Sequence, residues 1–268
     1  MTRTAIIAGA GALPSLICNA MAQRPLVAAL HGSTPAGLVP DLHFRVERLV
    51  PFLNHLIDQG ITRVCFAGAV QRPNLDPSLF DPLTAQMVPR LLAAMQAGDD
   101  ATLREVLAIF EEFDLKIVSA TDIAPGLTAP PGLLAGQTTA QDANDATRAA
   151  AIVAALGAVD VGQGVVVQAG LCLAVETLTG TDAMLAGVAQ IPLALRPKTT
   201  RGLYFKAPKP GQDMRIDQPT IGPQTLDMAA KAGLGGIVFQ AGGVILLERT
   251  ALILQAQALG LFLWSRSP

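Results

Sequence analysis

The sequence predicts an α/β protein, with an N-terminal Rossmann-like β-α-β domain followed by a second, mixed α/β domain. Short aliphatic runs, typical of buried strands, alternate along the chain with segments whose apolar residues recur at helical spacing. The 268 residues are 51% hydrophobic and only 15% charged, so the chain must bury a large core. Such alternation is typical of a parallel sheet covered by helices.

The first half contains the repeated strand–helix pattern. Its strands are short aliphatic runs, and its helices show apolar residues three or four positions apart, as in Leu103, Val106, Leu107 and Phe110. In chain order we expect strand Thr4–Ala8, helix Leu13–Ala22, strand Leu26–Leu30, helix Phe52–Asp58, strand Arg63–Ala67, helix Leu83–Met95, a helix opening at Asp99-Asp100, and strand Leu115–Val118. These elements form a first domain over residues 1–135.

The second half, residues 136–268, predicts a mixed α/β domain. The boundary follows from Asp122–Gln141, which is rich in Pro, Gly, Thr and Ala and is expected to be a linker or an exposed crossover. The turn Ala169-Gly170 closes a hairpin. In order we expect helix Asp142–Leu156, strands Gly164–Gln168 and Leu171–Val175, helix Thr181–Ala189, strand Gly202–Lys206, helix Gln224–Ala232, strands Gly236–Phe239 and Val244–Leu247, and helix Arg249–Leu259.

Composition excludes several classes of protein. With 21 acidic and 19 basic residues the net charge is −2, which gives no global basic field for nucleic acid. Despite a mean hydropathy of +0.44, the richest apolar window, Leu234–Trp264, is interrupted by polar residues and predicts no membrane span. We therefore expect no nucleic-acid partner and no transmembrane helix.

The start of the chain imitates a signal peptide, with Arg3, an apolar stretch and the triplet Ala20-Met21-Ala22. Gly9, Gly11 and Pro14 would break the helix of such a peptide, and a strand–turn–helix explains all three. The three cysteines, Cys18, Cys65 and Cys172, fit neither a disulfide framework nor a zinc cluster. A cytoplasmic location fits best.

The loop Gly9-Ala10-Gly11-Ala12-Leu13-Pro14 stands between a strand and a helix, as a phosphate-binding loop should. It lacks the full dinucleotide fingerprint, because Pro14 occupies the position of the third glycine and no acidic residue follows at the distance needed for a ribose. A tight β-α turn that needs glycine is the plainer interpretation. Binding of a nucleotide or sugar phosphate is the functional one.

A basic segment runs from Arg196 to Arg215 and holds 6 of the chain's 19 basic residues. They are Arg196, Lys198, Arg201, Lys206, Lys209 and Arg215. Only Asp213 offsets them within the segment, which Asp217 follows. Lys and Arg bind phosphate oxygens, and a carboxylate can hold a cation that bridges them. The alternative is a solvated loop with ordinary surface ion pairs.

Other acidic residues have plain structural interpretations. Asp182 is expected near a helix N-terminus, Glu176 at a strand end, Asp160 in a turn, and Asp99-Asp100 in a first helical turn. His31, His43 and His55 have no close cysteine or second histidine, so a zinc site is not expected.

Together these segments resemble the LpxI-type UDP-2,3-diacylglucosamine pyrophosphatases of lipid A biosynthesis, along nearly the whole chain. The resemblance rests on Ile7-Ala8-Gly9 with Gly11-Ala12-Leu13-Pro14, Cys65-Phe66-Ala67-Gly68 with Arg72-Pro73, Gly98-Asp99-Asp100, Asp160-Val161-Gly162-Gln163, Val175-Glu176, Gly180-Thr181-Asp182-Ala183-Met184-Leu185, Lys206 to Lys209, Arg215-x-Asp217 and Pro219-Thr220-Ile221-Gly222. It implies hydrolysis of UDP-2,3-diacylglucosamine to UMP and 2,3-diacylglucosamine 1-phosphate, with Mg²⁺ or Mn²⁺, by two domains that close around the lipid product.

On this resemblance, Asp217, Arg215 and Lys206 are the expected catalytic residues, and Asp217 ranks above Asp213. The expected metal ligands are Asp217, Asp182 and Glu176. The expected substrate contacts are Gly9, Gly11, Ala12, Leu13, Gly68, Arg72, Thr181, Lys209 and Gln163.

Two departures from the family pattern matter. Ala186-Gly187 stand where the family tends to carry arginine, so Arg196 or Arg201 would have to supply that phosphate contact. The region Gly32 to Pro51 also looks shorter than usual.

Two alternatives from other classes are a non-catalytic nucleotide-binding module and a nicotinamide oxidoreductase. The absence of an acidic residue that could bind the ribose of a dinucleotide argues against the oxidoreductase. The expected partner is a lipid-linked nucleotide sugar. Peripheral contact with the inner membrane face and a homodimer are both compatible with the chain.

Overall fold

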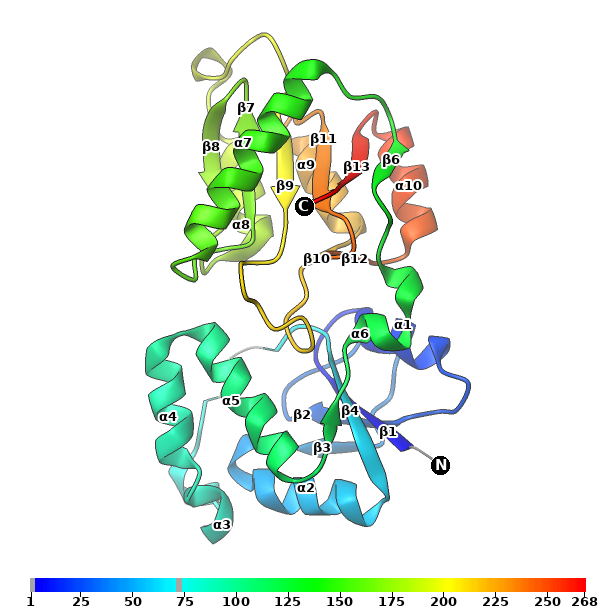
Figure 1. Ribbon diagram of the computed structural model, residues 1–268, viewed down its shortest axis with the longest axis vertical. Helices are drawn as coiled ribbons and strands as arrows, with labels where there is room; N and C mark the ends of the chain where they lie inside the picture. The colour runs from blue at the N-terminus through cyan, green and yellow to red at the C-terminus, as the bar shows by residue number, and fades with distance from the viewer. Residues whose placement is uncertain (1–2, 71–73) are drawn as a thin grey trace. The chain divides into compact units, whose positions relative to one another are not determined.

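The computed structural model describes residues 3–70 and 74–268, so the expected substrate contact Arg72 lies outside the described residues. The chain divides into two compact units, each with its own sheet (Figure 1). The N-terminal unit comprises Met1–Pro125 and Asp213–Asp217, and the C-terminal unit comprises Gly126–Gln212 and Gln218–Pro268. The chain thus passes between units after Pro125, Gln212 and Asp217, whereas the sequence places one boundary after residue 135.

A five-stranded parallel sheet forms the centre of the N-terminal unit, in the order β3-β2-β1-β4-β5. Helices α2, α4 and α5 bury Leu53, Leu91 and Leu107 in one core with Ala5 and Ile7 of β1. The elements are β1 (Arg3–Ala8), α1 (Leu13–Ala20), β2 (Leu26–Leu30), β3 (Leu42–Phe44), α2 (Leu49–Asp58), β4 (Ile61–Ala67), α3 (Pro82–Ala85), α4 (Val88–Ala97), α5 (Asp99–Glu112), β5 (Lys116–Ile117) and α6 (Ala120–Ile123), with short 3₁₀ turns at Val46–Arg48, Pro77–Leu79 and Pro125–Leu127. The predicted Rossmann-like pattern is confirmed.

Two differences from prediction have local causes. The single helix expected over Leu83–Met95 is two helices, α3 and α4, because Pro89 stands in the first turn of α4. Proline has no N–H to donate in a helix interior, but it is well accommodated where a helix begins. The prediction contains no strand at β3, since three residues at a sheet edge are too few to show a pattern.

The C-terminal unit is built on a six-stranded mixed sheet in the order β6-β13-β11-β9-β7-β8. Strands β9, β11 and β13 are parallel, and β6, β7 and β8 pair antiparallel, so the predicted hairpin of β7 and β8 is confirmed. Helix α7 packs on one face with Val153, and α8, α9 and α10 pack on the other with Leu185, Leu226 and Leu252. The result is a three-layer arrangement.

The bounds of the C-terminal elements follow the prediction in most places. They are β6 (Gly132–Ala135), α7 (Ala140–Gly157), β7 (Gly164–Gln168), β8 (Leu171–Val175), α8 (Gly180–Ala189), a 3₁₀ turn (Leu193–Leu195), β9 (Leu203–Lys206), β10 (Thr220–Ile221), α9 (Pro223–Lys231), β11 (Gly236–Gln240), β12 (Ile245–Leu246), α10 (Arg249–Ala258) and β13 (Phe262–Arg266). Asp122–Gln141 is not a plain linker, because β6 within it pairs with β13. The prediction contains neither of these two strands.

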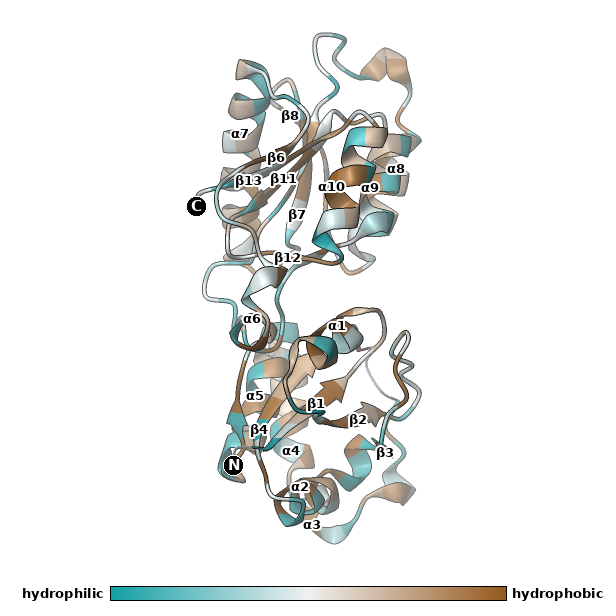
Figure 2. Ribbon diagram, turned by 90° about the vertical axis from the view of Figure 1, so that its right-hand side faces the viewer, coloured by the Kyte–Doolittle hydropathy of each residue, from teal (hydrophilic) through white to brown (hydrophobic). Residues whose placement is uncertain are grey.

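Apolar residues concentrate in the strands and on the helix faces that cover them (Figure 2). Among the described residues, no helix is both long and apolar enough to cross a membrane. The three cysteines are unpaired. Burial raises the pKa of the Cys65 thiol to about 12, so this group stays protonated and unreactive.

Candidate active site

The predicted glycine loop lies at the topological switch point of the N-terminal sheet. From β1 the chain adds β2 and β3 on one side, and β4 then pairs on the other side of β1. The loops after β1 and β4 therefore lie side by side at the carboxyl ends of neighbouring strands, where open α/β sheets bind ligands. Gly9, Gly11, Ala12 and Leu13 lie after β1, and Gly68 follows β4.

Gly9 and Gly68 are required because the two loops touch through their backbones. A Cβ atom on Gly9 would lie 2.5 Å from the Ala69 carbonyl oxygen, and one on Gly68 would lie 2.6 Å from that of Ala10. Ala10 and Ala69 exchange two main-chain hydrogen bonds of 2.7 and 3.0 Å. Gly68 also has a φ of +93°, which side chains rarely adopt. Any side chain at either position would separate the loops.

Helix α1 begins directly after this turn and has no side-chain cap at Ala12. The Ser15 hydroxyl donates to the Ala12 carbonyl at 2.8 Å instead. Main-chain N–H groups at a helix start favour an anion. Phosphate binding by this loop stays a prediction, and these N–H groups are the ones that would contact the anion.

In the C-terminal unit, four side chains form a buried lysine cluster: Lys206, Thr181, Glu176 and Tyr204. The Lys206 ammonium donates to the Thr181 hydroxyl at 2.9 Å, and that hydroxyl donates to Glu176 Oε1 at 3.1 Å. The Tyr204 hydroxyl lies 3.3 Å from the same hydroxyl. Lys206 is only 6% exposed. The fold thus holds a positive charge in a fixed position where β9 ends.

Glu176 supplies the negative charge of this cluster. Its Oε2 atom lies 3.9 Å from the Lys206 ammonium and has no hydrogen-bond partner among the described residues. Gly162 and Gly164 make room for it, since a Cβ on Gly162 would lie 2.1 Å from the Glu176 carbonyl oxygen and one on Gly164 would lie 2.6 Å from Oε2. This packing explains Gly162 of the Asp160-Val161-Gly162-Gln163 motif and Gly164, which directly follows it. The Gln163 carbonyl accepts from the Ala207 N–H at 3.0 Å.

Tyr204 also belongs to the buried lysine cluster, and it is absent from the residues predicted from the sequence. It is the only tyrosine in the chain and is fully buried on β9, two residues before Lys206. Residues two apart on a strand share a face, which is the signal that would have placed it here. Burial, followed by the charge of Glu176, raises the pKa of Tyr204 well above its usual value, so the phenol stays neutral.

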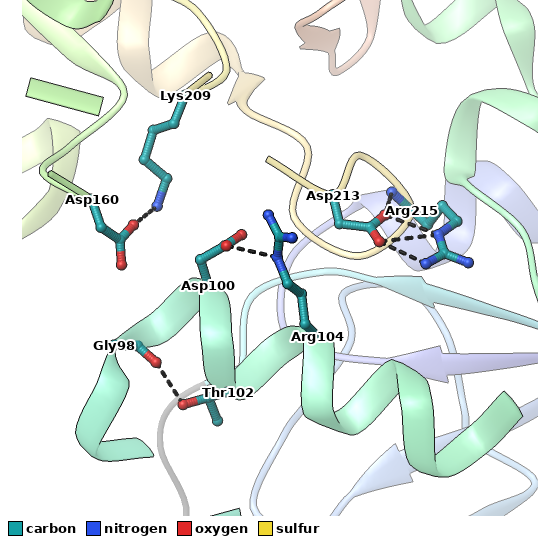
Figure 3. Close-up of polar contacts among 8 residues, drawn as sticks. All are labelled: Gly98, Asp100, Thr102, Arg104, Asp160, Lys209, Asp213 and Arg215. Carbon is teal, nitrogen blue, oxygen red and sulfur yellow. Dashed lines mark hydrogen bonds and ion pairs between the residues drawn. The ribbon is translucent and has the colours of Figure 1, made fainter. Parts of the chain in front are cut away.

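The other predicted residues of this unit have separate partners. Lys209 forms an ion pair with Asp160 (Figure 3). Asp182 accepts a hydrogen bond of 2.8 Å from Gln224.

The two arginines expected to replace the family arginine at the position of Ala186-Gly187 bind other groups. Arg196 is buried and donates to Gln168 Oε1 and to the Ala232 carbonyl, and Arg201 donates to the Gly260 carbonyl. Both therefore stabilise the fold.

Residues Asp213–Asp217, here called the crossing segment, belong to the N-terminal unit. Arg215 donates to both oxygens of Asp213 and forms a 2.6 Å ion pair with Glu111 of α5 (Figure 3 shows the Arg215–Asp213 pair). Ile216 packs against the core of that unit. The Arg215 guanidinium holds the pKa of Asp213 below its usual value, so this carboxylate stays charged. The segment is thereby fixed on α5, with Asp217 at its end.

The three predicted metal ligands do not gather within one unit. Glu176 and Asp182 belong to the C-terminal unit and Asp217 to the N-terminal unit. Over the described ranges, no three His, Cys, Asp or Glu side chains lie close enough together to hold a metal ion. A magnesium ion can take one or two carboxylates together with substrate phosphates, and does not need a cage of protein ligands.

Both halves of the chain match known proteins. Residues 3–127 match the family model described as the LpxI N-terminal domain, and residues 130–264 match the LpxI C-terminal domain. A curated relative, the UDP-2,3-diacylglucosamine pyrophosphatase LpxI of Caulobacter vibrioides, is 38% identical over 276 aligned positions, which cover 100% of this chain and 99% of that protein.

Proposed function

Because the chain belongs to the LpxI family, we propose that it hydrolyses the pyrophosphate bond of UDP-2,3-diacylglucosamine to UMP and 2,3-diacylglucosamine 1-phosphate, in lipid A biosynthesis. The observation that carries this proposal is the full-length match to both family domains, in order. The protein is a hydrolase of a phosphoric anhydride and neither a plain binding module nor a nicotinamide oxidoreductase.

The chemistry needs charged groups at the phosphates. Water adds to one phosphorus, the bond from that phosphorus to the bridging oxygen breaks, and the water proton passes to a base or to solvent. Asp217 is the carboxylate that orients the water or holds a cation. Lys206, already desolvated and held by Thr181, would stabilise the charge that develops on the phosphate oxygens.

A divalent cation, Mg²⁺ or Mn²⁺, is part of this proposal. A bound cation would supply charge neutralisation at the phosphates, and oxygen donors such as Asp217 favour these two ions over zinc. The support for it is the chemistry of a pyrophosphate and of the carboxylates.

The purified protein should release UMP from UDP-2,3-diacylglucosamine in the presence of Mg²⁺. Excess EDTA should stop the release, and added Mg²⁺ or Mn²⁺ should restore it. No UMP under any of these conditions would contradict the proposed function. Full activity in EDTA would contradict the cation alone.

A cavity in the C-terminal unit has an apolar wall that suits an acyl chain, and its lining also includes Gln240, Arg266 and Ser267. It has a volume of about 420 Å³, and its walls include Ala150, Val153 and Phe205 beside Lys209. We expect Ala154→Trp, which would fill the cavity from α7, to raise KM for the diacyl substrate about tenfold, the effect of losing one to two kcal/mol of apolar burial. Steady-state kinetics measure this. Ala155, the next residue of α7, is exposed and does not line the cavity, so Ala155→Trp should leave KM unchanged. An equal rise of KM in both variants would contradict the assignment of the cavity to an acyl chain.

Arg215 is expected to contact a phosphate, and its anchor provides a matched control. Arg215→Gln should lower kcat about 10- to 100-fold, the loss of one charge-assisted hydrogen bond, with little change in substrate affinity. Glu111→Gln removes only an exposed ion pair and should lower kcat less than about threefold. UMP release and substrate affinity are measured on both. Equal losses of kcat in the two variants would mean that Arg215 only holds the crossing segment in place. An unchanged kcat in both variants would mean that Arg215 is a solvated surface residue.

We further propose that the enzyme acts in the cytoplasm, in peripheral contact with the inner membrane face that carries its lipid substrate. The unpaired cysteines support a reducing compartment. A homodimer stays a prediction, which light scattering of the purified protein would test.

A further inference from the structure

We propose that the N-terminal unit carries a binding site for a phosphate monoester, separate from the glycine loops and the crossing segment. His31, His43 and His55 line one cavity of about 430 Å³, together with Arg45 and Arg48. The chain contains only three histidines, so the fold brings all of them to a single cavity. This proposal does not depend on the proposed function.

The cavity, here called the histidine pocket, lies at the edge of the parallel sheet. β3, which carries His43, is the outer strand, and His31 directly follows β2. Arg45 precedes the 3₁₀ turn that leads into α2, Arg48 is the last residue of that turn, and α2 carries His55. A strand, a strand end, a turn and a helix thus each contribute a nitrogen-bearing side chain.

The charge of the histidine pocket is positive. None of its lining residues is acidic. Arg45 Nη2 lies 3.0 Å from His31 Nε2, and the Arg48 side chain is exposed. Arginine guanidinium groups match the oxygens of a phosphate, and histidine adds further N–H donors.

Two carboxylates influence these arginines without closing the site. The charge of Asp76 acts on Arg45 and that of Asp81 acts on Arg48. Each carboxylate already caps the start of a helix: Asp76 accepts from the Ser78 N–H and hydroxyl, and Asp81 accepts from the N–H groups of the first turn of α3. The arginines therefore keep donors for a ligand.

The rest of the lining is apolar and aromatic. Phe44 and Phe52 are stacked, with ring centroids 4.0 Å apart and an interplanar angle of 7°. Leu42 and Pro51 complete this wall. A volume of about 430 Å³ lies in the range of small-molecule sites. The ligand is therefore a phosphate joined to a flat or apolar group, either a soluble ester or the headgroup of a lipid.

Histidine ring signals in NMR spectra provide a direct test. In the tag-free, full-length protein every such signal comes from the histidine pocket, because the chain has no other histidine. Phenyl phosphate should shift all three sets of signals in a saturable manner. Inorganic phosphate should bind more weakly, since it has no group to contact the Phe44–Phe52 wall. Vesicles of phosphatidylcholine with and without phosphatidic acid test the lipid source.

The double variant Arg45→Gln/Arg48→Gln should weaken phenyl phosphate binding at least tenfold, because it removes both guanidinium groups. Arg24→Gln is the matched control: Arg24 is exposed in the same unit, is paired with Asp41 and does not line the pocket. A backbone spectrum and a melting curve show whether the variants are folded.

Each result decides the proposal. Saturable shifts with phenyl phosphate, lost in the double variant and kept in Arg24→Gln, support a soluble ester. Shifts confined to vesicles with phosphatidic acid support a lipid headgroup. Shifts that rise linearly with every probe, or that persist in the folded double variant, overturn it. Shifts that depend on protein concentration alone also overturn it, since a second copy of the chain would then cover the pocket.

Discussion

Replacing Asp217 with alanine is expected to lower kcat about 100- to 1000-fold, the range seen when a key electrostatic group of an active site is removed. Asp217 ends the crossing segment, whose start is fixed on α5 through Arg215 and Glu111. The Asp217 N–H donates to the Asp213 carbonyl at 3.3 Å, a backbone contact that alanine retains. Turnover should therefore fall while the fold and substrate binding persist. UMP release, calorimetric binding and a melting curve measure the three quantities.

The control for this prediction is Asp58→Ala. Asp58 is an exposed carboxylate at the end of α2 in the same unit, and its removal should leave the rate unchanged. If the Asp217 variant keeps more than about a tenth of the wild-type rate, Asp217 is not at the centre of the reaction. A lowered melting temperature would instead indicate a structural role.

The second large effect is expected for Lys206→Met, which removes the charge but keeps the length of the side chain. Turnover should fall about 100-fold or more, because the buried ammonium is a preorganised charge. Stability should also fall, since Glu176 loses the neighbouring positive charge. Removing one partner of a buried ion pair typically lowers the free energy of unfolding by about 3–5 kcal/mol. We expect a loss near the lower value, because the two charged groups of this pair are 3.9 Å apart.

A double variant separates the two effects. Lys206→Met/Glu176→Gln removes both charges, so the melting temperature should recover most of its loss while UMP release stays low. Lys231→Met, at the exposed end of α9, is the control for loss of a lysine in the same unit. Recovery of activity together with stability in the double variant would mean that Lys206 is structural and not catalytic.

The central strands could be predicted from the sequence because burial on both faces leaves a continuous aliphatic signal. β1, β2, β4 and β7 each contain such a run, and all four were expected. Edge and terminal strands carry no comparable signal. β6 is a four-residue strand in a Pro- and Gly-rich stretch, and only its pairing with β13 makes it part of the sheet.

The candidate site was predictable as a set of residues but not as a set of contacts. Local sequence places a glycine turn before α1 and Lys206 at a strand end. It cannot place Arg215 beside Glu111, since the two are 104 positions apart in the chain. The local sequence also cannot distinguish Tyr204 from an ordinary aromatic residue of the core, because the contact of its hydroxyl with Thr181 depends on how α8 packs against β9.

The crossing segment also sets the order in which the protein can be completed during synthesis. Ile216 packs against the core of the N-terminal unit, yet this residue is translated 91 positions after Pro125. At about 5–20 residues per second, the ribosome needs roughly 5 to 20 s to supply it. The unit that is made first is therefore finished only when most of the other unit has left the ribosome. A fragment that stops at the apparent domain boundary lacks the segment that covers one side of its hydrophobic core.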